Sequence, residues 1–260
     1  MKKMLNNFRM ILSRIFNFFY HRTKIIIFRR ISNALVKGLE VNVDDVIIIL
    51  TTISDLHYQA KPFYEKEMFN IIINDLYSNE DKEIVFIDVG ANIGRYSLFL
   101  AKRFPKLKVI AIEPDPDAYS ALAKGVKVNG LTNVIAVNIA VSDINGFTTL
   151  FKKYDASLSS IIDSTNTIKT IKVTTKRLDD VVGGLGLGRV DWVKIDVEGA
   201  ELHVLRGFRS GIARFKPRVI IEVKGFNREG VFSFFREVNY ECKHIPEDES
   251  REYYVCVPKS

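Results

Sequence analysis

Short apolar runs alternate with amphipathic segments through residues 84–260. The runs are rich in β-branched and aromatic residues, which is typical of strands buried on both faces of a sheet. The predicted strands occupy residues 84–88, 108–113, 134–140, 191–196 and 218–223. Apolar positions at helical spacing predict one helix directly after the first of these strands. They predict three more helices at residues 117–129, 199–215 and 227–238. This alternation predicts an α/β domain with a mainly parallel sheet.

Two departures from the alternation are visible in the second half of the chain. Runs at 240–245 and 252–257 are separated by a polar turn, so we expect a final hairpin with one antiparallel edge strand. Residues 142–190 lack a long helical pattern, and runs at 147–152 and 170–175 predict a hairpin insertion. Long loops in compact domains are often functional, so this insertion either borders an acceptor site or is a plain surface hairpin.

The first 39 residues are basic and contain no acid. Their apolar residues recur at helical spacing and predict one amphipathic helix over residues 1–39. The basic residues are Lys2, Lys3, Arg9, Arg14, Arg22, Lys24, Arg29, Arg30 and Lys37. Because the whole chain carries +7, residues 40–260 carry −2, and the basic character belongs to this leader. Three roles stay open: a helix on an anionic membrane, a helix packed on its own domain or a second subunit, and a nucleic-acid-binding arm.

Residues 40–83 are expected to form a helical connecting region. The alternating strands and helices of the core begin after it, at residue 84. Within it, residues 62–77 show helical spacing, and residues 43–53 are apolar enough for a strand or a short buried helix. The predicted organisation is therefore a leader over 1–39, a connection over 40–83, and a main domain over 84–260.

The cysteine content and the hydropathy of the chain indicate the cellular compartment in which the protein is expected. Cys242 and Cys256 fit neither a disulfide framework nor a zinc-ligand pattern, so we expect reduced thiols in the core or an edge strand. No uncharged run approaches the roughly 18 residues that span a bilayer, and no signal-peptide cleavage pattern is present. These features predict a cytoplasmic protein, with peripheral contact between residues 1–37 and an anionic membrane left open.

A glycine turn directly follows the first strand of the core. It reads Asp88-x-Gly90-x-x-x-Gly94, which is looser than the G-x-G-x-x-G turn that binds a dinucleotide pyrophosphate. An acid at the strand end can meet the ammonium of an amino-acid tail, and Glu113, nineteen residues after Gly94, suits two ribose hydroxyls. Together these features indicate S-adenosylmethionine as the cofactor.

Several acids are predicted at the carboxyl ends of the strands, where open α/β sheets bind ligands. They are Asp88, Glu113, Asp196, Glu198 and Glu222. Carboxylates gathered on one rim are costly unless a cation, a proton or a hydrogen-bonding ligand compensates them. A divalent cation held by Asp196, Glu198 and Glu222 is one alternative, although oxygen ligands alone do not specify a metal and none is predicted. His203, on the following helix, is expected to be structural, and Lys194 is expected to pair with a rim acid.

Five motifs carry a family resemblance over residues 84–223. They are VFIDVGANIGRYS, AIEPDPDAY, VNIAVSD, KRLDDVV and VKIDVEGAELHVLRG. In this order they resemble the FkbM family of S-adenosylmethionine-dependent methyltransferases. The resemblance implies a class I methyltransferase (Rossmann-like) three-layer fold, with a seven-stranded sheet whose last strand is antiparallel. It also implies O-methylation of sugars or natural products. The family often carries a His shortly after the strand-five acid, whereas Glu222 is followed here by Val223, Lys224 and Gly225.

The resemblance also implies roles for particular residues. The implied cofactor residues are Asp88, Gly90, Ala91, Asn92, Gly94, Glu113, Pro114, Asp115, Asn138, Ala140, Val141 and Asp196. An alcohol acceptor must lose its proton, so a base is useful; Asp196 or Glu198 is the candidate, with Glu222 behind them.

The predicted function is O-methyl transfer to a hydroxyl of a sugar, glycan or related small molecule. Two alternatives stay open: an RNA methyltransferase that uses the basic leader, and a non-catalytic cofactor-binding subunit. Nucleic acid is disfavoured because residues 196–199 read Asp-Val-Glu-Gly rather than the motif expected for methylation of base amino groups. A homo-oligomer is compatible with the sequence.

Overall fold

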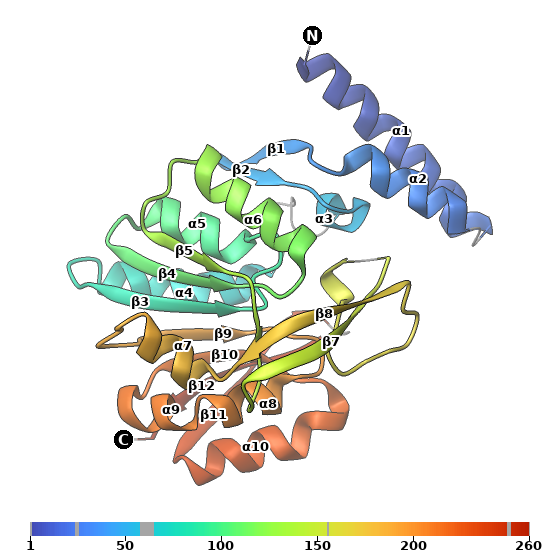
Figure 1. The fold of residues 1–260 in the computed structure, drawn as a ribbon. Coiled ribbons are helices and arrows are strands. Elements are labelled where there is room, and N and C mark those ends of the chain that lie inside the picture. The colour runs from blue at the N-terminus through green and yellow to red at the C-terminus, as the bar shows by residue number, and fades with distance from the viewer. Residues whose placement is uncertain (1, 24–25, 58–64, 155, 249–250, 260) are drawn as a thin grey trace.

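A seven-stranded sheet forms the centre of the protein in the computed structural model, which describes residues 2–23, 26–57, 65–154, 156–248 and 251–259 (Figure 1). The strand order is β11-β12-β10-β9-β3-β4-β5. In chain order the bounds are β3 Ile84–Val89, β4 Leu107–Ile112, β5 Val134–Val137, β9 Trp192–Ile195, β10 Arg218–Glu222, β11 Tyr240–Asp248 and β12 Arg251–Pro258. All pairs from β10 to β5 are parallel, so the predicted mainly parallel sheet is confirmed.

The antiparallel strand is in the interior of the sheet and not at its edge. The last strand, β12, pairs antiparallel with β10 on one side and β11 on the other. The predicted antiparallel last strand is confirmed, but its expected edge position is wrong. The final hairpin folds back so that β12 lies against β10 and β11 becomes the edge.

Helices cover both faces of the sheet and make three layers (Figure 1). One face carries α4 (Lys66–Ser78), α5 (Arg95–Arg103) and α6 (Pro116–Val128). The other carries α7 (Leu178–Gly184), α8 (Glu201–Gly207), α9 (Arg209–Phe215) and α10 (Arg228–Glu237). Neighbouring residues of β3 point to opposite faces of the sheet. Phe86 packs on the face that carries α4 and α5, Ile87 packs on the face that carries α7 to α10, and both side chains are fully buried.

Two predicted elements are each divided into two. The helix expected over 199–215 breaks at Phe208, where the backbone of Gly207 approaches residue Ser142 so closely that a Cβ would lie 2.1 Å from its carbonyl oxygen. The strand expected over 134–140 ends at Val137, and the chain continues as β6 (Ala140–Val141) in a different sheet.

The predicted hairpin insertion is present. Strands β7 (Gly146–Lys152) and β8 (Lys169–Lys176) pair antiparallel, and β6 joins β8 to make a three-stranded sheet. A short 3-10 turn, η1 (Ala156–Leu158), lies between the two long strands.

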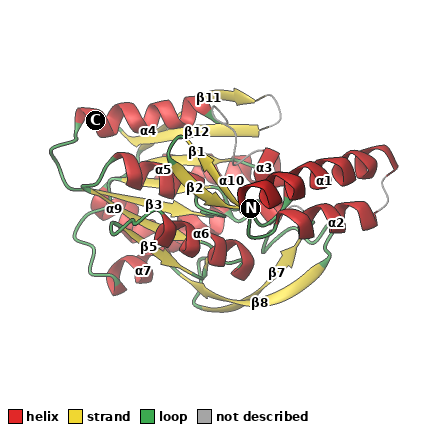
Figure 2. Cartoon of the chain, turned by 90° about the horizontal axis from the view of Figure 1, so that it is seen from above, coloured by secondary structure: helices red, strands yellow, loops and turns green. Residues whose placement is uncertain are grey.

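The leader forms two helices rather than the single helix that we expected. Helices α1 (Lys2–Thr23) and α2 (Ile26–Val36) lie side by side and project from the domain (Figures 1 and 2). No described helix is long and apolar enough to cross a membrane.

The connecting region is not only helical. It also contains a small hairpin of β1 (Glu40–Val43) and β2 (Val46–Ile49), followed by α3 (Ile53–His57) and then α4. The predicted helix at 62–77 corresponds to α4, although residues 62–64 lie outside the described residues.

The expectation of two reduced thiols is wrong. Cys242 and Cys256 face each other across β11 and β12 and are joined by a disulfide. Periodicity predicts both strands, but the register that brings these two side chains together depends on the turn between them. The cysteines therefore no longer argue for a reducing compartment.

Candidate active site

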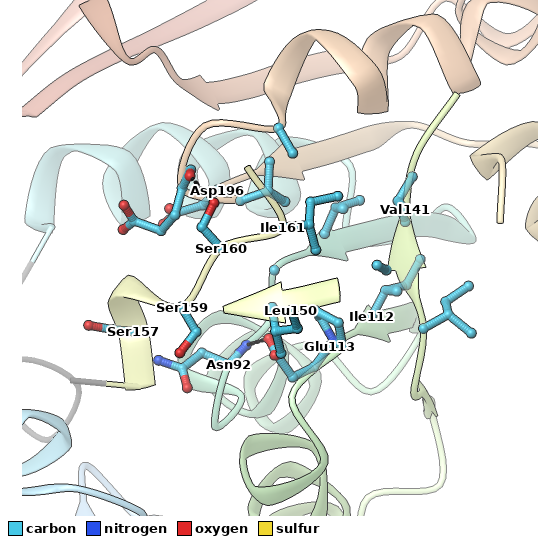
Figure 3. Close-up of a pocket in the computed structure, with 18 residues that line it drawn as sticks. Asn92, Ile112, Glu113, Val141, Leu150, Ser157, Ser159, Ser160, Ile161 and Asp196 are labelled. Carbon is cyan, nitrogen blue, oxygen red and sulfur yellow. Dashed lines mark hydrogen bonds between the residues drawn. The ribbon is translucent and has the colours of Figure 1, made fainter. Parts of the chain in front are cut away.

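A two-lobed cavity lies at the carboxyl ends of β3, β4 and β9. One lobe is mainly apolar, and its wall includes Ile112, Pro114, Ile139, Ala140, Val141 and Leu150 (Figure 3). The other lobe is charged, and its wall includes Glu65, Arg95, Lys194 and Arg251. Both lobes are lined by Gly90, Asn92, Ser157, Asp196 and Glu198. The cavity thus joins an apolar compartment to a charged one across a shared wall.

The glycine turn brings the ends of β3 and β9 together. Gly90 has a φ of +81°, and a Cβ there would lie 1.8 Å from the carbonyl oxygen of Asp196. Only glycine fits this position without moving the backbone. Asn92 also has a left-handed backbone, with a φ of 50°, and its buried Oδ1 has no hydrogen-bond partner among the described residues. The turn therefore presents an unsatisfied polar atom at the wall of the cavity.

Glu113 accepts two backbone hydrogen bonds at the end of β4. The N–H of Asn92 donates to its Oε2 at 2.8 Å, and the N–H of Asp115 donates to its Oε1 at 2.8 Å. Burial is the main cause that raises the pKa of Glu113 to about 8, against these hydrogen bonds. Hydroxyl groups of a ligand that donate to this carboxylate would favour its ionised form and so lower its pKa.

Four of the expected cofactor residues lie behind the cavity wall instead of lining it. They are Asp88, Gly94, Asp115 and Asn138. Asp88 accepts a hydrogen bond from Ser97 Oγ at 2.8 Å and lies 3.5 Å from Lys194 Nζ, so the ammonium that it meets belongs to the protein. The expected contact between Asp88 and the ammonium of a cofactor stays a prediction.

The other three hold neighbouring segments in position. A Cβ on Gly94 would lie 2.5 Å from Leu122, so this glycine permits α5 and α6 to pack closely. Asp115 accepts from the N–H of residue 117 at the start of α6 and from Lys152. Asn138 donates to the carbonyl oxygens of Glu113 and Pro114.

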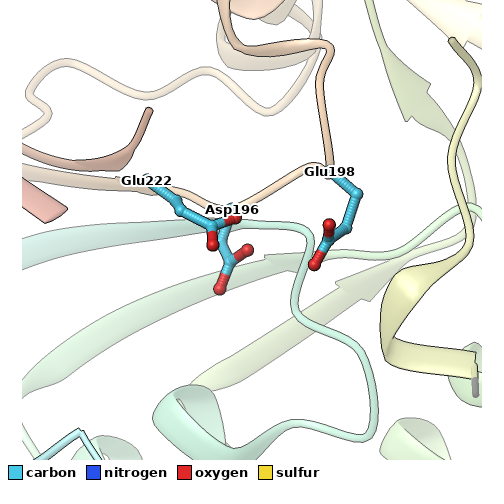
Figure 4. A group of neighbouring side chains, drawn as sticks. All are labelled: Asp196, Glu198 and Glu222. Carbon is cyan, nitrogen blue, oxygen red and sulfur yellow. The ribbon is translucent and has the colours of Figure 1, made fainter. Parts of the chain in front are cut away.

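Three carboxylates meet beside the shared wall. Ligand oxygens of Asp196, Glu198 and Glu222 lie within 4.8 Å of one another (Figure 4). Asp196 and Glu198 line the cavity, whereas Glu222 is buried behind them and lines neither lobe. Glu198 has a left-handed backbone with a φ of 51°, a conformation that costs free energy in a residue other than glycine.

Two lysines compensate these acids. Lys194 Nζ lies 3.3 Å from Asp196, and Lys224 Nζ lies 2.9 Å from both Glu198 and Glu222. The predicted pairing of Lys194 with a rim acid is confirmed. The role of Lys224 was missed because nothing in the sequence indicates that residue 224 bends back toward residue 198.

The three acids differ in pKa. Burial would raise the pKa of Asp196, but the charge of Lys194 and other nearby cations hold it below its usual value. Burial and the charge of Asp196 raise the pKa of Glu198. Burial, together with the charges of both other acids, raises the pKa of Glu222 to about 8. The cluster therefore contains one carboxyl group with a lowered pKa and two with a raised pKa.

Residues 88–244 match the model of the methyltransferase FkbM domain. The chain belongs to this family. It is a methyltransferase that uses S-adenosylmethionine, and its fold is that of class I methyltransferases.

The chain is also similar to individual methyltransferases and to a solved structure. This FkbM-domain chain is 30% identical over 191 residues to Methyltransferase sdnD of Sordaria araneosa, covering 62% of the chain and 73% of the relative. It is 28% identical over 152 residues to the 2-O-methyltransferase NoeI of Sinorhizobium fredii, covering 52% and 61%. The crystal structure of Methyltransferase FkbM from Methylobacillus flagellatus has a TM-score of 0.51 at 18% identity, over 68% of this chain and 44% of that one. At that identity the likeness concerns the fold alone.

The residues of this FkbM methyltransferase fit the cofactor. A nucleoside needs an apolar compartment with a hydroxyl acceptor, and the apolar lobe ends at Glu113. An amino-acid tail needs charges of both signs, which the other lobe supplies through Glu65, Arg95 and Arg251. Asn92 lines both lobes, and its buried Oδ1 has no partner among the described residues.

Two further segments contribute to the cavity. From the insertion, which we expected either to border an acceptor site or to be a plain surface hairpin, Ser157, Ser159 and Ser160 line the apolar lobe (Figure 3). Sequence patterns missed the contributions of Glu65, which precedes the core pattern, and of Arg251, in the final hairpin. His203 bonds Asp143 at 3.1 Å and lines neither lobe, as its expected structural role requires.

Proposed function

We propose that the protein transfers a methyl group to a hydroxyl of a sugar, a glycan or a related small molecule, with Glu198 as the base. The observation that carries this proposal is the position of Glu198, a cavity carboxylate with a raised pKa that is held by Lys224. The printed name of NoeI, a 2-O-methyltransferase, supports a hydroxyl acceptor.

The two lobes support a division of the cofactor between them. In this arrangement Glu113 accepts hydrogen bonds from the ribose hydroxyls, and the apolar residues of β6 and the insertion enclose the base. Arg95 and Glu65 then face the carboxylate and the ammonium of the tail. When bound, the cofactor supplies an electrophilic methyl carbon on a positively charged sulfur.

Glu198 is better suited to remove the proton than its neighbours. An acid with a low pKa is a weak base, which argues against Asp196. Glu222 lines neither lobe, so it acts through Lys224 and not on the acceptor. Glu198 would take the hydroxyl proton as the acceptor oxygen receives the methyl group, and the cofactor would leave as S-adenosylhomocysteine. Much of the remaining barrier is lowered by positioning the hydroxyl for in-line attack.

Methyl-labelled cofactor offered to a panel of acceptors tests the proposal. The panel contains sugars and glycans, matched deoxy sugars, and total RNA. We expect label in hydroxyl-bearing sugars alone, and a loss of about 100-fold in turnover for Glu198→Gln with cofactor binding retained. Asp196→Ala should impair both turnover and binding, because Asp196 lines both lobes.

Other results would point to the two alternatives. Label in RNA, but not in sugars, would favour a nucleic-acid methyltransferase. Cofactor binding without transfer to any acceptor would favour a non-catalytic subunit. Normal turnover in Glu198→Gln would remove Glu198 as the base while leaving the reaction class intact.

A further inference from the structure

The helical hairpin of α1 and α2 has polar groups where its two helices meet. The hydroxyls of Ser13 and Ser32 are fully buried and bond each other at 3.0 Å. Arg29, on α2, donates to Asn17 Oδ1 on α1 at 2.6 Å. Both contacts are satisfied within the protein, and Met10 and Phe16 pack on the same side of α1.

The apolar side of α1 faces outward. Five large apolar side chains, spaced three or four residues apart, are between 45% and 61% exposed: Leu5, Phe8, Ile11, Ile15 and Phe18. This spacing places them along one face of the 22-residue helix, which is about 33 Å long. A helix of a water-soluble domain normally buries such a face, so this one needs a partner.

The positive charge of the hairpin limits the kind of partner that can cover the apolar face of α1. Residues 1–39 carry nine basic residues and no acid. Among them Arg14, Arg22 and Arg30 are exposed. A second copy of this hairpin would bring like charges together, which opposes self-association. A nucleic acid would match the charge but leave the apolar face uncovered. An anionic lipid surface matches both.

We infer that the outward face of α1 docks on the surface of an anionic phospholipid bilayer. The apolar side chains enter the boundary between headgroups and acyl chains, while the arginines pair with lipid phosphates. The helix lies along the surface. This inference does not depend on which acceptor the enzyme uses.

Docking would also hold the cavity near the bilayer. Asn33 of α2 donates to the carbonyl oxygen of Tyr154 at 2.9 Å, in the insertion that lines the apolar lobe. Asn33 also accepts from the N–H of Ile53, and Lys37 pairs with Asp117 at the start of α6. The hairpin is therefore bonded to segments that surround the site.

Vesicle flotation of the full chain tests the inference. The probes are vesicles of phosphatidylcholine alone and of phosphatidylcholine mixed with phosphatidylglycerol. We expect flotation with the anionic vesicles, and binding weaker by about tenfold or more in the triple variant Phe8→Asn, Ile11→Asn, Ile15→Asn. Replacing Arg14, Arg22 and Arg30 by Gln should weaken binding to a similar degree and remove the preference for anionic lipid.

A matched control removes exposed apolar residues elsewhere on the protein. Val128, Ile144 and Phe147 are exposed outside the hairpin, and their triple replacement by Asn should leave flotation unchanged. Circular dichroism and S-adenosylhomocysteine binding establish that each variant is folded. The inference is overturned if folded wild-type protein does not float. It is also overturned if only the arginine variant loses binding, because the apolar face of α1 would then take no part in docking. A wild-type dimer that the apolar variant converts to monomer, without vesicle binding, would also overturn it.

Discussion

Ser160 Oγ donates a hydrogen bond of 2.7 Å to the carbonyl oxygen of Glu198. The Oγ of Ser160 also accepts hydrogen bonds from the N–H groups of Ile162 and Asp163 at 3.0 and 3.1 Å. One hydroxyl thus folds a turn of the insertion and fastens it to the loop that carries the proposed base. The insertion is therefore part of the site and not only a wall beside it.

Replacing Ser160 by Ala should separate the turn from the Glu198 loop. The change removes one donated and two accepted hydrogen bonds, each worth about 1 kcal/mol. Misplacement of the base should lower kcat by about tenfold. Steady-state kinetics with the labelled cofactor measure this effect. The control is Thr167→Ala, in the same insertion, which removes an exposed hydroxyl bonded to the carbonyl of Ser164. Equal kcat in both variants would show that the bond has no effect on catalysis.

Glu113 should make cofactor binding depend on pH. Its pKa is about 8 in the free protein, and ribose hydroxyls that donate to the carboxylate favour its ionised form. S-adenosylhomocysteine binding below pH 8 should therefore release protons, and affinity should rise with pH and level off above about 8. The same raised pKa makes the free protein less stable as pH rises from 4.5 to about 8, because the ionised carboxylate is buried.

Calorimetric titration in buffers of different ionisation enthalpy measures the released protons. Glu113→Gln should abolish the buffer dependence and weaken binding by about 10- to 100-fold, the worth of a charge-assisted hydrogen bond. Glu80→Gln, on an exposed loop, is the control. Buffer dependence that persists in Glu113→Gln would assign the proton to a different group.

Lys224 should supply the positive charge that a divalent cation would otherwise bring to the carboxylate cluster. Its ammonium lies 2.9 Å from both Glu198 and Glu222, so the protein itself supplies positive charge to this cluster. Lys224→Met removes a charge that lowers the pKa of Glu198, and that pKa should rise. The acidic limb of the pH–kcat profile should then move to higher pH, and kcat at neutral pH should fall by about tenfold or more.

Chelation distinguishes this arrangement from a metal site. Treatment with EDTA should leave wild-type turnover unchanged, since we expect no metal in the reaction. Loss of activity on chelation, with recovery on adding Mg²⁺, would instead mean that the three acids bind a cation during turnover. Lys153→Met, which removes an ion pair in the insertion, controls for the loss of a lysine.

The core could be predicted because its signals are local. Strands such as 84–88 and 218–223 are buried on both faces, and a continuous apolar run is the direct consequence. The glycine turn and Glu113 could be placed at the cavity because strand ends in a parallel sheet converge on one edge. The acids at residues 196 and 198 meet there for the same reason.

The features that the sequence did not predict depend on contacts between segments that are distant in the chain. Asp88 turns toward Ser97 and Lys194 because α5 packs beneath the turn, which no spacing reveals. The leader shows amphipathic periodicity, but not which side of α1 would pack, because that depends on Ser13 meeting Ser32. The charged lobe combines residues from α5, β9, β12 and the segment before α4, and no motif spans them.

The Cys242–Cys256 disulfide should contribute measurably to stability. It closes a loop with a sequence separation of 14, and a loop of this length contributes about 3 kcal/mol in the chain-entropy description. Urea unfolding followed by circular dichroism should give a free energy of unfolding that falls by about 2 to 3 kcal/mol when dithiothreitol is added. The double variant Cys242→Ser, Cys256→Ser should be insensitive to dithiothreitol, which separates the effect of the bond from other effects of the reductant. Two reactive thiols in wild-type protein that was denatured without reductant would contradict the pairing and restore the expectation of reduced cysteines.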